Sequence, residues 1–148
     1  MTEISSNRPQ IGIGVWVVKE NKVLLGKRKS LLGEGCWAPP GGHLEFGEEV
    51  EQGAARELEE ETNLIALNLI PICWTSEIFH KEKKHYVSLH LIGDGCQGEL
   101  KLMEPTKCEE WRWFTLDNLP QNLFLSAKKF IEMKHLQAHI SQKEKLAL

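Results

Sequence analysis

A run of glutamates that follows a glycine turn constrains the fold of this chain more than any other feature. Eight of the chain's 21 acidic residues are glutamates between Glu45 and Glu61, and Arg56 is the one cation among them. The segment Glu49–Thr62 contains no proline and a single glycine, and Ala, Leu, Glu and Gln dominate it. Because these residues are good helix formers, the segment predicts a helix with a strongly negative face.

Three of these glutamates are spaced so that one helix would bring them together. Glu57, Glu60 and Glu61 would project within about 100° of arc, where each charge destabilises the helix and raises the pKa of the others. A solvated acidic face is the simplest interpretation. The alternative is a site for one or more divalent cations, because hard ions such as Mg²⁺ prefer carboxylate oxygens. The preceding turn, Pro40-Gly41-Gly42, supports the second interpretation, since its backbone can approach a ligand and offer a carbonyl oxygen.

The order of the other segments predicts a mixed sheet covered on both faces. The hydrophobic period changes several times along the chain, from the period of a strand to that of a helix and back. Ser30–Gly42 holds four glycines and two prolines and is expected to be a loop. Glu48 should lie at the start of the acidic helix and cap it, and Asn63 should end it. The expected strands lie near 11–18, 23–29, 69–79, 85–91 and 110–114, and a final amphipathic helix spans 123–140.

Size and composition restrict the class of protein. The 148 residues are the length of one ordinary domain, and a net charge of −3 does not suit a protein that holds nucleic acid through bulk basic charge. The longest apolar run, 12–18, is too short to cross a bilayer, and the first ten residues do not resemble a secretory signal. Four cysteines without a CxxC pair are typical of reduced thiols. We therefore expect a single cytoplasmic domain, 1–148, with no membrane or nucleic-acid polymer as partner.

The segment 42–64, GHLEFGEEVEQGAARELEEETNL, resembles the Nudix box of the Nudix hydrolases. The family pattern is Gly, five residues, Glu, seven residues, Arg-Glu, an aliphatic residue, any residue, Glu-Glu, any residue, Gly and an aliphatic residue. One position departs from it, because Asn63 stands where the family has glycine, and asparagine is the mildest replacement at a left-handed position. The matching residues are Gly42, Glu48, Arg56, Glu57, Leu58, Glu60, Glu61 and Leu64.

This resemblance implies a fold and a chemistry. The fold is α+β, an α/β/α sandwich around a mixed sheet, and the reaction is hydrolysis of a nucleoside diphosphate linked to another group. Glu57, Glu60 and Glu61 would hold Mg²⁺, with Mn²⁺ able to substitute, and the Gly41 carbonyl would be a further ligand. Arg56 would position one of the box glutamates. Either a box glutamate or one of Glu104, Glu109 and Glu110 would accept the proton of the attacking water.

The stretch 23–47 resembles the MutT-like branch of the family, which acts on nucleoside triphosphates. The resemblance implies cleavage of a canonical or modified (d)NTP to monophosphate and pyrophosphate by a homodimer. Arg28, Gly42, His43 and Ser88 are the candidate substrate-binding residues. Two alternatives stay open: hydrolysis of ADP-ribose or a nucleotide sugar, and a Nudix-like module that binds a nucleotide without cleaving it.

Overall fold

The computed structural model of this chain describes residues 7–147, which form two sheets, three α-helices and a short 3₁₀ segment. The larger sheet has seven strands, and the smaller pairs two two-residue strands, β5 and β8. The elements are β1 (Gln10–Lys19), β2 (Lys22–Arg28), β3 (Trp37–Ala38), β4 (Gly41–His43), α2 (Val50–Thr62), β5 (Ile65–Ala66), β6 (Leu69–Phe79), β7 (Lys84–Asp94), β8 (Cys96–Gln97), β9 (Cys108–Thr115), η1 (Leu116–Asn118), α3 (Leu125–Glu132) and α4 (His135–Ala147).

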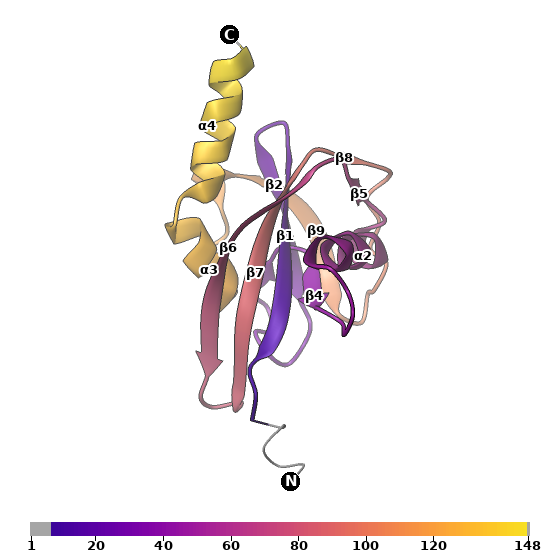
Figure 1. The fold of residues 1–148 in the computed structure, drawn as a ribbon, viewed down its shortest axis with the longest axis vertical. Coiled ribbons are helices and arrows are strands. Elements are labelled where there is room, and N and C mark those ends of the chain that lie inside the picture. The colour runs from indigo at the N-terminus through magenta and orange to yellow at the C-terminus, as the bar shows by residue number, and fades with distance from the viewer. Residues whose placement is uncertain (1–6, 148) are drawn as a thin grey trace.

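The large sheet is mixed because its central strand pairs both ways. Strand β1 runs parallel to β7 and antiparallel to β2 and β4, and β6 forms an edge beyond β7. Figure 1 shows α2 on one side of this sheet and α3 with α4 on the other. The strand period explains the two cores: Val15 and Val17 pack toward Leu58 of α2, whereas Trp16 packs with Phe130 of α3. The α+β fold, with a mixed sheet covered on both faces, is confirmed.

Three local predictions were wrong. The segment predicted as a loop, 30–42, contains β3 and the start of β4, which are too short to show a hydrophobic period. Glu48 does not cap α2; Glu49 is the N-cap and forms a capping box with Gln52. The expected C-terminal helix is two helices, α3 and α4, because Lys134 between them adopts a left-handed φ of 64°.

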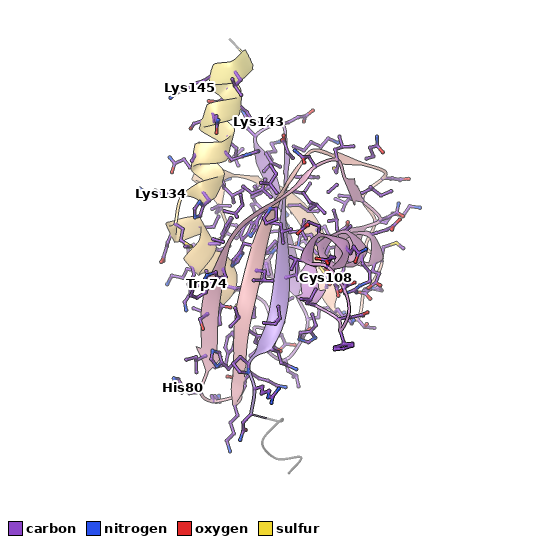
Figure 2. All side chains as sticks on the ribbon, viewed as in Figure 1. Trp74, His80, Cys108, Lys134, Lys143 and Lys145 are labelled. Atoms are coloured by element: carbon purple, nitrogen blue, oxygen red, sulfur yellow. The ribbon has the colours of Figure 1, made fainter. Side chains whose placement is uncertain are left out.

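Helix α4 is anchored to the end of β7 by charge. Lys143 donates a hydrogen bond of 2.5 Å to Asp94, and the pKa of Asp94 is lowered chiefly by this contact. Figure 2 shows Lys143 on the side of α4 that faces the sheet, with Trp74 projecting from the edge strand β6. Within residues 7–147, none of the helices combines the length and the apolar character needed to cross a membrane.

Candidate active site

The acidic helix and the glycine turn open onto one cavity of about 430 Å³. Strands β1, β4, β6 and β7, helix α2, the loop before β9 and the first turn of α3 all contribute to its wall. Glu57 and Glu61 enter from α2, and Glu104 enters from the loop before β9. The cavity therefore collects carboxylates from segments more than 40 residues apart in the chain.

Two glycines of β4 let this strand lie close to β1 and to the Glu57 side chain of α2 at the cavity. A Cβ atom on Gly41 would lie 1.9 Å from the carbonyl oxygen of Ile13, and one on Gly42 would lie 2.4 Å from the carboxyl carbon of Glu57. A side chain at position 41 would therefore collide with the backbone of β1, whereas one at position 42 would displace the Glu57 carboxylate. The close approach also lets the Gly41 N–H donate a hydrogen bond of 2.9 Å to Oε1 of Glu61.

The cavity carboxylates are held in a poorly solvated and mutually repulsive arrangement. The pKa of Glu61 is raised to about 8, chiefly by burial; the charges of Glu57 and Glu104 contribute to the increase, and the Gly41 hydrogen bond opposes it. Burial also raises the pKa of Glu57, with Arg56 acting in the opposite direction. Such a set suits a divalent cation, which would relieve both the repulsion and the cost of burial.

The three glutamates of the box do not occupy equivalent places. Glu60 does not line the cavity; its side chain is 52% exposed, and it lies 3.4 Å from Arg56. Among the described residues, no three acidic, histidine or cysteine side chains converge tightly enough to enclose a cation. Glu57 and Glu61 are thus placed to supply oxygens from the cavity wall, and Glu60 stands at its rim.

Arg56 is the centre of an ionic network beside the cavity. Its Nε donates to Glu48 at 2.7 Å, and its Nη1 donates to Glu57 at 2.9 Å. The hydrogen bond from Arg56 is the main reason why the pKa of Glu48 falls to about 2. Arg56 also donates to the backbone carbonyl of His43, at 3.1 Å. The guanidinium thus connects the turn, the start of α2 and Glu57, and it does not line the cavity.

All four sequence-predicted substrate residues line the cavity, namely Arg28, Gly42, His43 and Ser88. The Nε of Arg28 donates to the carbonyl of Leu32, and the guanidinium lies 4.1 Å from the ring centroid of Phe124. Burial lowers the pKa of Arg28. The ring of His43 stacks on Tyr86 with an interplanar angle of 6°. The structure therefore brings these residues to the same cavity as the box glutamates.

The three loop carboxylates considered for proton transfer are separated by the structure. Only Glu104 lines the cavity, within the field of Glu57 and Glu61. Glu109 lies 3.7 Å from Lys27, and Glu110 pairs with Arg112 at 2.7 Å, both at the exposed surface of β9. Of the three, Glu104 is therefore the one that faces the cavity.

Comparison with known proteins identifies the family. The model of the NUDIX domain matches residues 8–133. The chain belongs to the NUDIX family. The structure of a MutT NUDIX hydrolase from Burkholderia pseudomallei superimposes with a TM-score of 0.81 and 33% identity, covering 84% of this chain and 97% of that one.

Two curated relatives place the chain among the Nudix hydrolases. An ADP-ribose pyrophosphatase from Methanocaldococcus jannaschii is 38% identical over 116 residues, 78% of this chain and 68% of the relative. An oxidized purine nucleoside triphosphate hydrolase from Danio rerio is 32% identical over 139 residues, 84% of this chain and 85% of the relative. The resemblance to MutT-like Nudix hydrolases is confirmed, and this Nudix protein is a hydrolase.

The departure of this Nudix box from the family pattern is accommodated without disturbing α2. Asn63 ends the helix with a left-handed φ of 67°, and its N–H donates to the carbonyl of Glu59. Its side-chain amide donates to the carbonyl of Glu99 at 3.0 Å. Asparagine thus fills the conformational role of glycine and adds one tertiary hydrogen bond.

Sequence reasoning missed the part of this Nudix site that lies on β6 and the wall beside it. Glu77 lines the cavity although it is 1% exposed, and Phe79, Tyr86 and Phe124 line it as aromatic walls. Phe79 stacks on Phe124 with ring centroids 5.7 Å apart. The one available signal was a glutamate inside a segment that otherwise predicts a buried strand.

Proposed function

We propose that this Nudix hydrolase cleaves the anhydride between the α- and β-phosphates of a nucleoside triphosphate, canonical or modified at the base. The oxygen of a water molecule forms a bond to phosphorus while the α–β bridging P–O bond breaks. The products are a nucleoside monophosphate and pyrophosphate. The reaction is proposed to depend on Mg²⁺, for which Mn²⁺ can substitute.

One observation carries this proposal: a single cavity joins a carboxylate cluster to a compartment walled by aromatic rings. Glu57, Glu61 and Glu104 belong to the first part, and Phe79 and Tyr86 belong to the second. Aromatic faces suit a nucleobase, because base stacking contributes about 1–3 kcal/mol. A volume of about 430 Å³ falls within the ordinary range for small-molecule sites. The cavity thus supports a ligand with a base at one end and phosphates at the other.

Different residues would bind the metal ion and accept the proton of the attacking water. Glu57, Glu61 and the Gly41 carbonyl would hold the metal, with Glu60 joining from the rim. When bound, Mg²⁺ would neutralise phosphate oxygens and orient the attacking water. Glu104 would accept the proton of that water, because of the three loop carboxylates it alone lines the cavity.

The remaining polar residues would bind the substrate or hold Glu57 in position. Arg28 would pair with phosphate oxygens, and His43 and Ser88 would contact the substrate from β4 and β7. Lys107, which also lines the cavity and lies 3.6 Å from Glu104, adds a second cation near the phosphates. Arg56 acts as a positioning residue, since it holds Glu57 by a charge-assisted hydrogen bond and does not line the cavity.

The test is pyrophosphate and phosphate release from a nucleotide panel with Mg²⁺, with Glu61→Gln and Glu104→Gln beside the wild type. The panel holds canonical and oxidised dNTPs, NTPs, ADP-ribose and nucleotide sugars. Pyrophosphate release from triphosphates by the wild type, together with a large loss in Glu61→Gln, is the expected result. Activity in Glu104→Gln equal to the wild type would assign the proton acceptor to a box glutamate instead.

ADP-ribose hydrolysis is the second candidate, and one observation favours it: the Methanocaldococcus jannaschii relative, 38% identical, is named an ADP-ribose pyrophosphatase. Release of AMP from ADP-ribose, with triphosphates left intact, would establish this function in place of the first. Tight binding of a nucleotide without any cleavage in the panel would identify the non-catalytic module. The retained cavity carboxylates, Glu57 and Glu61, favour catalysis over that last function.

A homodimer and a cytoplasmic location are further predictions from the resemblance and from the sequence. The assembly is tested by light scattering coupled to size-exclusion chromatography. A mass of twice 16.9 kDa is expected, and a mass of one chain would contradict the homodimer.

A further inference from the structure

The carboxylate of Glu77 belongs to the wall of the active-site cavity, and one of its two oxygens has no hydrogen-bond partner among the described residues. Glu77 lies on β6, is 1% exposed and belongs to the cavity wall. Its Oε1 accepts a hydrogen bond of 2.5 Å from the Ser88 hydroxyl. Its Oε2 is buried and has no hydrogen-bond partner among residues 7–147. An unpaired buried polar atom is costly, so this oxygen requires a donor that residues 7–147 do not supply.

The surroundings of Glu77 suit a flat, uncharged ring. Glu77 pairs across the sheet with Tyr86, whose ring stacks on His43, and Phe79 stacks on Phe124 nearby. The adjoining floor is formed by Gly12 of β1, opposite Ser88, where the missing side chain leaves room. Glu77 takes part in none of the ion pairs among the described residues. A phosphate would be repelled by this carboxylate, so this part of the cavity suits the base.

The free lone pairs of the Glu77 carboxylate determine which base can form hydrogen bonds with it. Ser88 uses one position on Oε1, so Oε1 and Oε2 can each accept one further N–H side by side. Guanine presents two adjacent donors, N1–H and the 2-amino group, on its Watson–Crick edge. Adenine and cytosine place an acceptor nitrogen beside their amino group, and uracil places carbonyl oxygens on both sides of its N–H. An acceptor that faces a carboxylate is repelled and leaves both groups unpaired.

We infer that Glu77 is the residue by which this enzyme recognises the base, and that it selects guanine through paired hydrogen bonds from N1–H and the 2-amino group. The inference rests on the proposed function for the placement of the phosphates, and it adds the specificity of the base. Oxidation of guanine at C8 leaves both donors in place. Glu77 should therefore accept guanine and 8-oxoguanine alike.

The test compares kcat/KM for dGTP, dITP, dATP and dCTP between the wild type and Glu77→Gln. The glutamine keeps the shape of the side chain and places a donor where Oε2 accepts. We expect kcat/KM for dGTP to fall about 5- to 150-fold, the range for loss of one bidentate base contact, while that for dATP falls much less. In the wild type, kcat/KM for dITP, which lacks the 2-amino group, should lie between the values for dGTP and dATP. The ratio of kcat/KM for 8-oxo-dGTP to kcat/KM for dGTP should be the same in the wild type and in Glu77→Gln.

Two controls separate base recognition from loss of fold. Glu82→Gln makes the same change of charge at an exposed position in the turn between β6 and β7, and should leave all ratios unchanged. Ser88→Ala removes the hydroxyl donor to Oε1 and should weaken the preference for guanine less than Glu77→Gln does. Equal kcat/KM for dGTP and dATP in the wild type, or an unchanged ratio in a folded Glu77→Gln protein, would overturn the inference.

A binding measurement distinguishes this inference from the proposed function. Titration calorimetry of GMP and AMP, each without metal, requires no hydrolysis. Preferential binding of GMP that Glu77→Gln abolishes would support the inference even if no triphosphate were cleaved. Equal affinities of the wild type for GMP and AMP would refute it even if triphosphates were cleaved.

Discussion

The backbone N–H of Gly41 donates a hydrogen bond of 2.9 Å to Oε1 of Glu61, so that the glycine turn holds a carboxylate that its surroundings disfavour as an anion. In the metal-free protein, burial raises the pKa of Glu61 to about 8 from an ordinary value near 4.5. The folded state therefore binds more protons than the unfolded state between these two values. The contribution of Glu61 to stability in EDTA is full below about pH 4.5 and is lost as the pH rises toward 8.

The first prediction concerns Glu61→Gln and a divalent cation. In EDTA at pH 8, the variant should be at least as stable as the wild type, because it removes a charge that burial disfavours. Mg²⁺ should raise the melting temperature of the wild type by mass action, and this increase should grow from pH 6 to pH 8 as binding displaces fewer protons. The increase should be small in Glu61→Gln at both pH values. Thermal melting of the wild type and of Glu61→Gln, at pH 6 and at pH 8, with and without millimolar Mg²⁺, gives these four comparisons.

Glu59→Gln is the matched control, because it makes the same change of charge at an exposed position of the same helix. It should retain the full Mg²⁺ effect. A wild-type melting temperature that Mg²⁺ does not change at pH 8 would exclude the metal site.

The second prediction is that Arg56→Lys impairs catalysis more than folding. Lysine cannot bridge Glu48 and Glu57 with one planar group, so Glu57 would lose its fixed orientation. We expect kcat/KM to fall roughly 10- to 100-fold, as for other residues that orient metal ligands, together with a higher Mg²⁺ concentration for half-maximal rate. Steady-state kinetics over a range of Mg²⁺ concentrations measures both.

Arg112→Lys provides the comparison for Arg56→Lys. Arg112 also pairs with a glutamate, Glu110, at 2.7 Å, but it does so at the surface of β9 with a side chain 56% exposed. It should leave the rate and the Mg²⁺ requirement unchanged. An Arg56→Lys protein with a reduced rate but an unaltered Mg²⁺ requirement would contradict the positioning role.

The long elements and the carboxylate helix could be predicted from the sequence because their signals are local. A strand such as β1 is indicated by an apolar, β-branched run within ten residues, and the spacing of Glu57 and Glu61 fixes their common face on any helix. The requirement for glycine in β4, by contrast, depends on residues distant in the sequence. Gly41 is required by contact with the Ile13 carbonyl, which lies 28 positions earlier in the chain.

Glu77 could not be placed from the sequence because a bulge decides its face. The pairing of β6 with β7 shifts between Pro71 and Cys73, so that one extra residue, Ile72, reverses the alternation of all residues that follow. Pro71 stands at the shift, and proline inside a strand is typical of edge strands and bulges, but it does not identify which neighbouring residue is the extra one. The break at Lys134 was hidden for the opposite reason, because apolar residues keep a helical spacing on both sides of it.

The third prediction tests the position at which this Nudix box departs from the family pattern. Asn63→Ala should lower the free energy of unfolding by about 1–3 kcal/mol, since alanine is strained at a left-handed φ and loses the hydrogen bond to Glu99. Asn63→Gly should lie within about 1 kcal/mol of the wild type, because relief of strain offsets the lost hydrogen bond. Urea unfolding of the three proteins measures the difference. A glycine variant as unstable as the alanine variant would show that the side-chain hydrogen bond dominates.

The fourth prediction concerns a buried histidine, His90, in the wall of the cavity. His90 is 1% exposed; its Nδ1 accepts from the indole N–H of Trp16 at 3.0 Å, and its Nε2 lies 2.8 Å from the Thr75 hydroxyl. These contacts fit a neutral ring protonated at Nε2. The pKa of His90 is lowered to about 4, chiefly by burial and to a smaller extent by the charge of His135.

A lowered histidine pKa makes the fold sensitive to acid. Between about pH 4 and pH 6.5 the unfolded chain binds a proton at His90 that the folded chain does not, so stability is present above this window and is lost as the pH falls through it. We expect the difference in unfolding free energy between the wild type and His90→Gln to shrink by about 2 kcal/mol from pH 7 to pH 4.5. Urea unfolding in EDTA measures it, and the subtraction removes the opposite contribution of Glu61. His80→Gln makes the same substitution in the exposed turn after β6 (Figure 2) and is the matched control. A wild-type minus His90→Gln difference that stays constant over this range would contradict the prediction, because it would mean that His90 takes up its proton at the same pH in the folded and the unfolded protein.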